Sequence, residues 1–178
     1  MKTLVAYYTL TGNTRKVAEA IFYALAGEKT LLPLEDAGTP EGYDLIFIGF
    51  PVMQFGPPRI VRNFLSKKVA GKRIALFITH AMVSGSDAPQ QVVMLSKELD
   101  RCRAACSGSE LAGLFHCQGE LSEKIAEELM ESRIPMLMDF ASLRPLTLGH
   151  PDEAELAAAA EFAKNLTGRQ EPARAGEP

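Results

Sequence analysis

The residues between positions 9 and 14 are the first in the chain whose types and spacing suggest ligand chemistry. They are Thr9, Leu10, Thr11, Gly12, Asn13 and Thr14. The segment follows an apolar, strand-like stretch and leads into a helical pattern, so it would present unpaired backbone N–H groups and the positive end of a helix dipole to an anion. Its side chains add donors without charge, and Gly12 lets the backbone curve around a ligand. These features indicate a site for a terminal phosphate monoester, although Thr11 or Asn13 could instead be an ordinary N-cap.

The residues in this segment exclude several other phosphate motifs. A Walker loop needs Gly-Lys-Ser/Thr and a dinucleotide-binding turn needs Gly-x-Gly-x-x-Gly, and the segment has neither. It also lacks the cysteine and arginine of a phosphatase loop and the acidic pair of a phosphate-accepting receiver. The segment therefore predicts a phosphate that is held by neutral donors.

Five short apolar segments have the composition of strands that are buried on both faces. They cover residues 3–8, 29–34, 44–50, 73–79 and 111–117. Helical spacing of apolar residues follows most of them. It covers residues 14–25, 60–67, 90–103 and 122–131, with a last helix capped by Asp152 that runs to about Asn165. This alternation predicts a parallel sheet covered on both faces, with five strands in the doubly wound order 2-1-3-4-5.

The unusual loops all follow predicted strands. Besides residues 9–14, they are residues 51–58, which hold three prolines and Gly56, residues 79–89, and the segment after residue 115. The carboxyl ends of parallel strands meet at one edge of a sheet, where ligands bind in doubly wound folds. We therefore expect the site to lie at this edge.

The pattern Thr9-x-Thr11-Gly12-Asn13-Thr14 resembles the phosphate loop of the flavodoxin family, which binds flavin mononucleotide (FMN). The similarity continues in order along the chain, because residues 49–58 resemble the family's second flavin loop and residues 79–82 stand where the third would be. The segments 116–119 and 149–152 resemble a small bacterial subgroup of flavodoxin-like proteins. The resemblance covers about residues 1–167. It implies an α/β fold of the flavodoxin-like three-layer type with FMN as the cofactor.

The resemblance also implies which residues hold the cofactor. The phosphate would sit on residues 9–14, and the isoalloxazine ring would lie between the loops 51–56 and 79–86. Phe55 and Met53 can contact the ring from one side and Met82 from the other, and a peptide near Gly56 could flip as the ring gains a proton. The ring-binding residues predicted in this way are Pro51, Val52, Met53, Gln54, Phe55, Gly56, Thr79, His80, Ala81 and Met82.

The chain departs from the family in two respects. It has no tryptophan, and none of its four tyrosines lies in a ring loop. Aromatic stacking disfavours the reduced anionic ring, so we expect a less strongly reducing flavin. The net charge of −3 is mild for an electron shuttle, and the acidic residues between Glu120 and Glu131 fit either a solvated helix face or a docking site.

Three further groups of residues leave alternatives open. His80 and His116 end neighbouring predicted strands, where they could donate to the ring, relay protons, or be structural histidines. Cys117 is expected to be a buried, inert thiol. Cys102 and Cys106 lie one helical turn apart, but two ligands do not make a zinc site. The apolar segment 134–138 could pack on the sheet edge, cover the flavin or form a homodimer contact.

Composition limits the class of protein. The 178 residues carry 22 acidic and 19 basic side chains, which gives no electrostatic reason to expect nucleic acid or an anionic membrane as a partner. With no signal peptide and no apolar run long enough to span a bilayer, we expect a cytoplasmic protein with one domain over residues 1–167 and a disordered tail over 168–178. We expect an FMN-binding electron-transfer protein and favour a carrier over an NAD(P)H-dependent oxidoreductase, without deciding whether the protein is an enzyme. The alternatives are an NAD(P)H-dependent FMN or quinone reductase on the same fold, and a non-redox module that binds a phosphate ligand.

Overall fold

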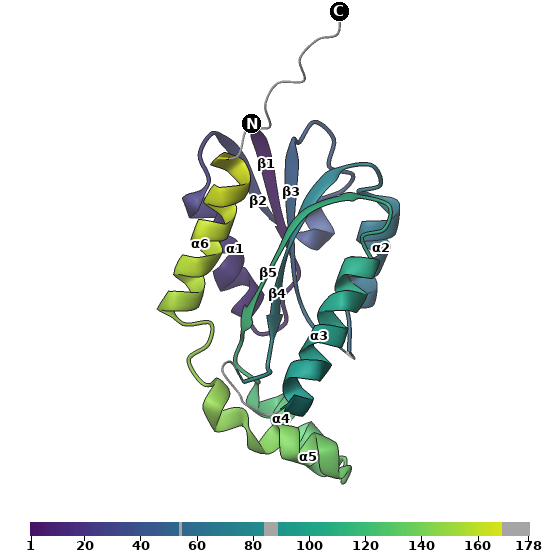
Figure 1. The fold of residues 1–178 in the computed structure, drawn as a ribbon, viewed down its shortest axis with the longest axis vertical. Helices are drawn as coiled ribbons and strands as arrows, with labels where there is room; N and C mark the ends of the chain where they lie inside the picture. The colour runs from purple at the N-terminus through teal and green to yellow at the C-terminus, as the bar shows by residue number, and fades with distance from the viewer. Residues whose placement is uncertain (54, 84–88, 169–178) are drawn as a thin grey trace, which may run out of the picture.

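Five parallel strands form the centre of the computed structural model, which describes residues 1–53, 55–83 and 89–168 (Figure 1). The strands are β1 (Lys2–Tyr7), β2 (Glu28–Pro33), β3 (Leu45–Pro51), β4 (Arg73–His80) and β5 (Glu110–Gln118). Their order in the sheet is β2-β1-β3-β4-β5, and every pairing between neighbours is parallel. The predicted flavodoxin-like fold class and strand order are confirmed.

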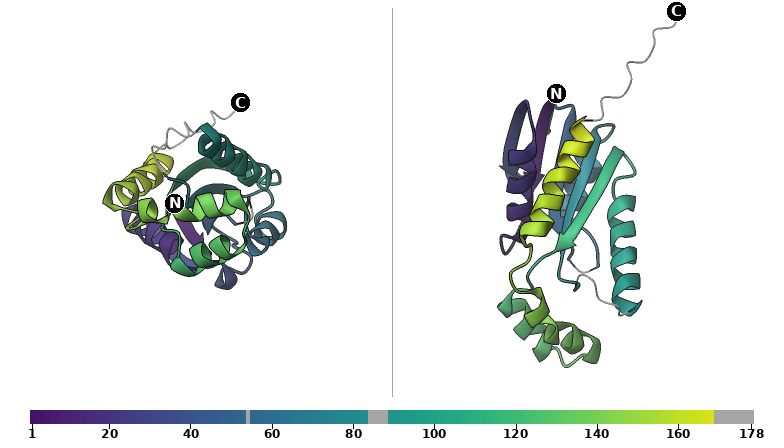
Figure 2. Two further views of the ribbon diagram at one scale, coloured as in Figure 1. Left: turned by 90° about the horizontal axis from the view of Figure 1, so that it is seen from below. Right: turned by 60° about the vertical axis from the view of Figure 1, so that its left-hand side comes forward.

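Helices cover both faces of this sheet, which gives three layers (Figures 1 and 2). One face packs against α1 (Asn13–Ala24) and α6 (Glu153–Gly168), and the other against α2 (Arg59–Lys67) and α3 (Pro89–Ala104). α1 forms because Val17, Ala18 and Ile21 recur on one helical face, and all three are buried against the sheet.

The core lies in the central strands, whose residues are apolar without alternation because both faces are covered. The first six residues of β3 are all buried. Gly49 in this strand has a packing role, since a Cβ atom there would lie 1.9 Å from the Phe77 ring of β4. A larger residue at position 49 would displace that ring.

A helical hairpin stands apart from the three layers, at the carboxyl edge of the sheet (Figures 1 and 2). It consists of α4 (Glu123–Glu131), α5 (Pro135–Ser142) and the short 3-10 helix Arg144–Thr147. We call residues 123–147 the lid. The sequence predicted α4, whose N-cap Ser122 accepts from the Ile125 N–H. It did not predict α5, which is only eight residues long and begins at a proline, so its periodicity is short.

The last helix begins after the predicted cap and includes Gly168, the first residue of the predicted tail. Asp152 caps α6 through its Oδ1, which accepts from the Glu155 N–H at 2.8 Å. α6 runs three residues beyond the predicted Asn165, to Gly168. The tail predicted from residue 168 otherwise lies outside the described residues. Within the described part of the chain, no helix is long and apolar enough to cross a membrane.

Candidate functional site

A cavity of about 530 Å³ lies between the carboxyl edge of the sheet and the lid. All three predicted loops reach it. Its wall includes these residues of the predicted set: Thr9, Leu10, Thr11, Asn13, Thr14, Pro51, Val52, Met53, Phe55, Thr79, His80, Ala81 and Met82. Of the other predicted residues, Gly12 and Gly56 do not line it, and Gln54 lies outside the described residues. The structure therefore brings residues from three distant segments to one site.

The loop 9–14 ends in a helix start that no side chain caps. Gly12 is the N-cap of α1, with φ 94° and no side-chain hydrogen bond, so neither Thr11 nor Asn13 is the ordinary N-cap that the sequence allowed. The Gly12 N–H donates to Thr9 Oγ1 at 3.0 Å. In the described part of the chain, the N–H groups of Asn13, Thr14 and Arg15 donate no hydrogen bond. These groups fit a phosphate, which accepts several hydrogen bonds from a helix N-terminus.

Two side chains of the same loop hold its surroundings in place. Asn13 Nδ2 donates to the Glu120 carbonyl at 2.9 Å, and the hydroxyls of Thr14 and Thr79 are hydrogen-bonded at 2.8 Å. A Cβ atom at Gly119 would lie 3.0 Å from the Asn13 side chain, so the chain after β5 approaches this loop closely. Asn13 and Thr14 thus connect the loop to β4 and to the segment that enters the lid.

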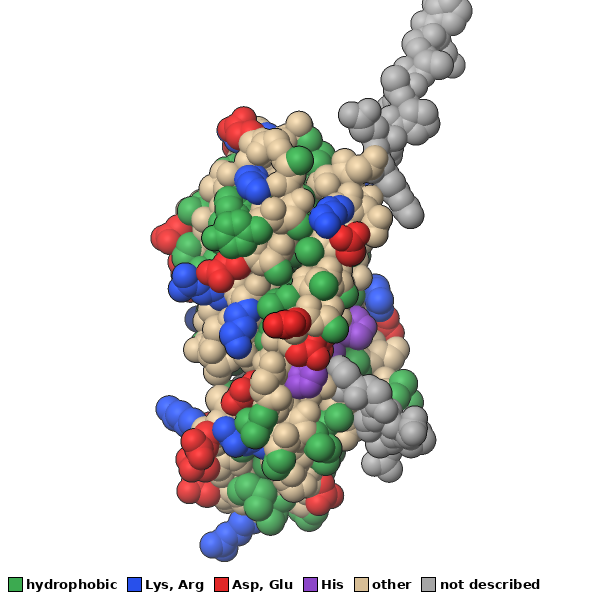
Figure 3. All heavy atoms as spheres, turned by 90° about the vertical axis from the view of Figure 1, so that its left-hand side faces the viewer, with side chains coloured by type: hydrophobic (Ala, Val, Ile, Leu, Met, Phe, Trp, Pro, Cys, Tyr) green, Lys and Arg blue, Asp and Glu red, His purple; other side chains and the backbone are tan. Residues whose placement is uncertain are grey.

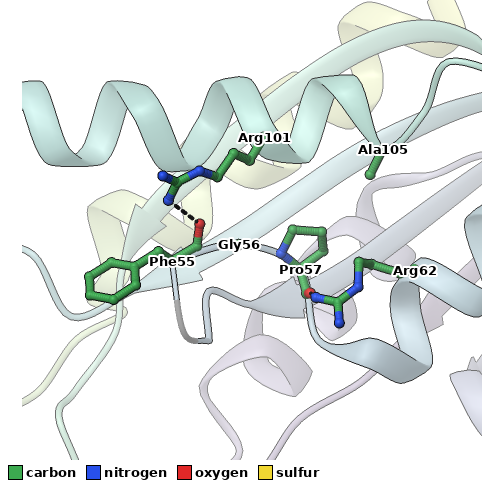
Figure 4. Close-up of a pocket in the computed structure, with 6 residues that line it drawn as sticks. All are labelled: Phe55, Gly56, Pro57, Arg62, Arg101 and Ala105. Carbon is green, nitrogen blue, oxygen red and sulfur yellow. Dashed lines mark hydrogen bonds between the residues drawn. The ribbon is translucent and has the colours of Figure 1, made fainter.

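The loop 51–56 makes a tight turn at its tip. Met53 and Gly56 exchange two backbone hydrogen bonds of 2.9 and 3.1 Å, and Phe55 has φ 67°, a left-handed conformation that is uncommon for an aromatic residue. The Arg101 guanidinium of α3 donates to the Phe55 carbonyl at 2.9 Å (Figure 4). Arg62 of α2 donates to the Pro57 carbonyl at 2.7 Å. Two arginines therefore fix the outer side of this loop.

His80, at the end of β4, and His116, two residues before the end of β5, form a hydrogen-bonded pair. The sequence predicted that both would end their strands beside the ring, but His116 does not line the cavity. His80 Nε2 and His116 Nδ1 are 3.1 Å apart. His80 is 6% exposed and lines the cavity, whereas His116 is exposed. Burial and the neighbouring His116 lower the pKa of His80 to about 4, and the Met82 backbone acts in the opposite direction. A neutral imidazole at pH 7 can accept a proton at one nitrogen while releasing one at the other.

Glu98 of α3 also lines the cavity, and sequence reasoning missed it. Glu98 is 4% exposed, and no hydrogen bond to its carboxyl is found in the described part of the chain. Burial raises the pKa of its carboxyl, against a smaller lowering by Arg101. An acid that is buried in a cavity with a raised pKa is a candidate functional group. A lone glutamate within a helical pattern gives no signal of this in the sequence.

The lid supplies one wall of the cavity. From the lid, the cavity is lined by Ile125, Glu128 and Leu129 of α4 and by Met136, Leu137 and Phe140 of α5. The segment that enters the lid adds Gly119, Glu120, Leu121 and Ser122. The sequence left three roles open for residues 134–138: packing on the sheet edge, covering the flavin, or forming a homodimer contact. Met136 and Leu137 line the cavity, so this segment covers the site. The remaining lining residue that sequence reasoning missed is Met94 of α3. Phe140 adds a second aromatic ring to the cavity wall besides Phe55 of the predicted ring loop.

The lid joins the sandwich through two chain segments, residues 118–122 and 146–150, which we call the neck. The Glu120 N–H donates to the His150 carbonyl at 2.9 Å, and the Leu121 N–H donates to Thr147 Oγ1 at 3.0 Å. Gln118 Nε2 donates to the Leu146 carbonyl at 2.8 Å. These bonds hold the two segments side by side where the lid begins and ends. Figure 3 shows histidine side chains at the surface at the level where lid and sandwich meet.

The cysteines and His150 have structural surroundings. Cys117 is buried, and burial raises the pKa of its thiol to about 12, as expected of an inert cysteine. Cys102 and Cys106 are also buried, and the Cys106 thiol donates to the Cys102 carbonyl at 3.5 Å. His150 Nδ1 lies 2.6 Å from Glu155 Oε2, so it braces the start of α6.

Comparison with known proteins gives consistent matches. A family model described as the flavodoxin domain matches residues 4–164. The chain is 30% identical over 177 residues to the flavodoxin-like domain-containing protein BilS of Clostridioides difficile (strain CD3), covering 93% of this chain and 96% of that protein. Among solved structures, oxidised flavodoxin 2 from Bacillus cereus gives a TM-score of 0.57 at 17% identity, covering 96% of this chain and 100% of that one. A flavodoxin from the domain Archaea gives 0.55 at 14% identity, covering 94% and 97%. At such identities the structural likeness establishes the fold.

Proposed function

Because this chain belongs to the flavodoxin domain family, we propose that the cavity under its lid binds FMN and that the protein carries electrons to and from a redox partner. Bound FMN would supply the one- and two-electron redox chemistry that amino-acid side chains lack. The chain supplies binding, orientation and control of protons. The observation that carries this proposal is the single cavity that joins the uncapped start of α1 to the two predicted ring loops.

The phosphate would rest on the loop 9–14. The N–H groups at the start of α1 would donate to it, and the helix dipole would favour its negative charge. Thr9 Oγ1 accepts from the Gly12 N–H, so its own hydroxyl proton remains available to an acceptor in the cavity. Gly12 holds the φ of 94° that this curvature requires.

The ring would lie between apolar side chains of the sandwich and the lid. Met53 and Phe55 line one part of the cavity, Met82 another, and Phe140 lines it from α5. The buried Nδ1 of His80 has no hydrogen-bond partner among the described residues, although the backbone of Met82 is close enough to raise its pKa. A polar atom of a bound ligand would satisfy this nitrogen, and the exposed His116 would connect it to solvent.

A carrier must let electrons leave the site, and the loop 51–56 offers the route. Phe55 lines the cavity and is also 46% exposed, so a single aromatic side chain separates the proposed ring position from the outer surface. Arg101 fixes its carbonyl from outside. Electron transfer to a partner at this surface would not require the lid to open.

A second function is favoured by the lid itself. A lid that excludes water and a buried carboxyl with a raised pKa at Glu98 would both serve an NAD(P)H-dependent reductase that protonates a small acceptor in the cavity. Rapid bleaching of the bound flavin by NADPH, with turnover of a quinone, would favour this enzyme over the carrier.

The proposal is tested by titrating the purified protein with FMN and with riboflavin, which lacks the phosphate, while recording visible absorbance. We expect one FMN per chain and much weaker riboflavin binding. Gly12→Ala should weaken FMN binding about tenfold, because the free variant can relax out of the left-handed conformation, and restoring it around the phosphate costs an L-residue about 1–2 kcal/mol. Riboflavin binding should be unchanged.

The matched control is Gly38→Ala. Gly38 also has a positive φ, of 54°, and its Cβ would likewise meet no atom within 4 Å, but it lies outside the loop 9–14 and away from the start of α1. It should leave both affinities unchanged. Equal binding of FMN and riboflavin would contradict the phosphate site, and no spectral change with excess FMN would contradict the redox function and favour a module for another phosphate ligand.

A further inference from the structure

A basic surface surrounds the loop that separates the cavity from solvent. A shallow depression of about 430 Å³ is lined there by Phe55, Gly56, Pro57, Arg62, Arg101 and Ala105 (Figure 4). Phe55 is the one residue that lines both this depression and the cavity under the lid. In Figure 4 the two arginines reach the loop from different helices, Arg101 from α3 and Arg62 from α2.

Two more cations extend this surface along the same helices. Arg59 lies three residues before Arg62 on α2, and Lys97 lies four residues before Arg101 on α3, spacings that place each pair on one helical face. All four cations are exposed. We call Phe55 with Arg59, Arg62, Lys97 and Arg101 the basic face.

Carboxylates do not neutralise the basic face. None of its four cations forms a salt bridge within the described residues. α2 contains no acidic residue. On α3, Asp100 pairs with Arg103 at 2.8 Å, and Glu98 is buried in the cavity wall. The chain as a whole has a net charge of −3, so a group of four cations without a salt bridge contrasts with the overall charge.

We propose that the basic face docks the acidic surface of a redox partner protein, with Phe55 in the contact. This inference rests on the proposed electron-carrier function, and it names the charge of the partner. Arg62 and Arg101 each use one guanidinium donor on a loop carbonyl, which holds the side chain in place and leaves other donors for carboxylates of the partner. The exposed aromatic ring of Phe55, which lies to the side of Arg101 away from Arg62 in Figure 4, adds an apolar contact.

The test uses two haem proteins of opposite charge as probes: cytochrome b5, which is acidic, and cytochrome c, which is basic. Stopped-flow reduction of each by the reduced, FMN-loaded protein is followed at increasing ionic strength. We expect the rate constant with cytochrome b5 to be the larger at low salt and to fall as salt is added. Arg59→Glu and Arg62→Glu should each lower it about tenfold, within the range that electrostatic steering supplies.

Lys67→Glu is the matched control, because it makes the same change of charge at the far end of α2, outside the basic face. It should lower the rate less than Arg59→Glu does, most clearly near 0.15 M ionic strength, where the Debye length is about 8 Å. Arg59 is the sharper test position, since it donates to no loop carbonyl among the described residues and its reversal changes charge alone. Equal effects at positions 59, 62 and 67, or a faster reaction with cytochrome c, would overturn the proposal.

A second readout needs no flavin. Cytochrome b5 added to the ¹⁵N-labelled chain without FMN should shift the backbone resonances of residues 55–62 and 97–101, and Arg59→Glu should weaken these shifts. If FMN fails to bind but the shifts map to this face, the docking inference stands and the electron-carrier function fails. Shifts elsewhere, or displacement of cytochrome b5 by NADPH at the same residues, would refute the docking inference in favour of another contact or a nucleotide site.

Discussion

The sandwich and the lid are built on different amounts of buried surface. Two large clusters of buried side chains hold the sandwich together, one on each face of the sheet. The lid takes part in one small cluster, in which Ala126 and Ala141 of the lid are buried with Leu121 of the neck and pack against Ala81 of the sandwich. Several large apolar side chains of the lid remain exposed, among them Met130, Ile134 and Met136, and hydrophobic side chains appear on its surface in Figure 3.

This difference implies that the sandwich positions the ligand and that the lid controls access to the cavity. The phosphate loop and both ring loops follow strands whose residues are buried, so the sandwich fixes where the ligand groups lie. The lid is held by the neck and by apolar contacts across the cavity, and a region with few buried contacts opens at a lower free energy than the whole domain. A ligand can therefore enter by opening the lid while the sandwich stays folded.

The largest effect is expected in the sandwich core. Phe47 is fully buried, with its ring 6.1 Å from that of Phe162, so Phe47→Ala should lower the free energy of unfolding by about 3–5 kcal/mol. Phe140→Ala in the lid should lower it by less than about 1 kcal/mol, because the ring is half-buried and the lid opens before the sandwich unfolds. Urea unfolding compares the two, and equal losses would mean that lid and sandwich unfold as one unit.

The next effect depends on pH and on His80, which lies in the sandwich at the floor of the cavity. Burial keeps its pKa at about 4, below the ordinary 6.5. The unfolded chain therefore binds a proton that the folded chain does not, so stability is lost as pH falls from 6.5 to 4. The 2.5-unit difference corresponds to about 3 kcal/mol at the lower end.

His80→Gln removes this titration. The unfolding free energies of the wild type and His80→Gln are measured in urea from pH 7.5 to pH 4. Over this range the wild type should lose about 3 kcal/mol more than His80→Gln does. His116, on the neighbouring strand, also has a lowered pKa, through burial and Arg103, so His116→Gln is measured alongside to separate the two. Parallel curves for the wild type and His80→Gln would show that His80 is not buried as a neutral ring.

The sequence predicted the sandwich more fully than the lid, for a physical reason. The strands carry unbroken apolar runs, and the loops that follow them carry glycine, proline and hydroxyl residues, so both the sheet and its ligand edge follow from local composition. α5 is one short helix after Arg133, whose φ of 57° interrupts the chain direction. Its contribution to the cavity, through Met136, Leu137 and Phe140, depends on the neck that folds it back over the sheet. Contacts of this kind leave no local pattern.

The neck can be tested with a smaller expected effect. Thr147 is 1% exposed, and its hydroxyl accepts from the Leu121 N–H at 3.0 Å and donates to the Arg144 carbonyl at 2.8 Å. Thr147→Val leaves the Leu121 N–H unpaired, which costs about 1–3 kcal/mol. We expect faster amide hydrogen exchange over α4 and α5, with the strands unchanged.

Thr167→Val in α6 is the control for the neck variant. Its hydroxyl donates to the Ala163 carbonyl at 3.0 Å on a half-buried part of the sandwich, so the same substitution there should leave exchange in the lid unaltered. Faster exchange in the strands of the Thr147→Val protein would show that the neck supports the whole fold rather than the lid alone.

The smallest effect concerns Glu98, whose acidic side chain is buried in the part of the cavity wall that α3 forms. Burial raises its pKa, so the folded state favours the neutral acid, and the stability that this carboxyl contributes at low pH is lost as pH rises through its folded pKa. At neutral pH, Glu98→Gln should therefore stabilise the ligand-free protein by up to about 1 kcal/mol, and the gain should vanish near pH 4, where the carboxyl is protonated in both states. Glu127→Gln on the exposed side of the lid should change nothing at either pH. If Glu98→Gln stabilises the protein, the sandwich keeps a carboxyl that lowers its own stability. This carboxyl lies where a proton donor on α3 can reach the cavity. Destabilisation by Glu98→Gln at neutral pH would instead assign the carboxylate to the fold, through its attraction to Arg101.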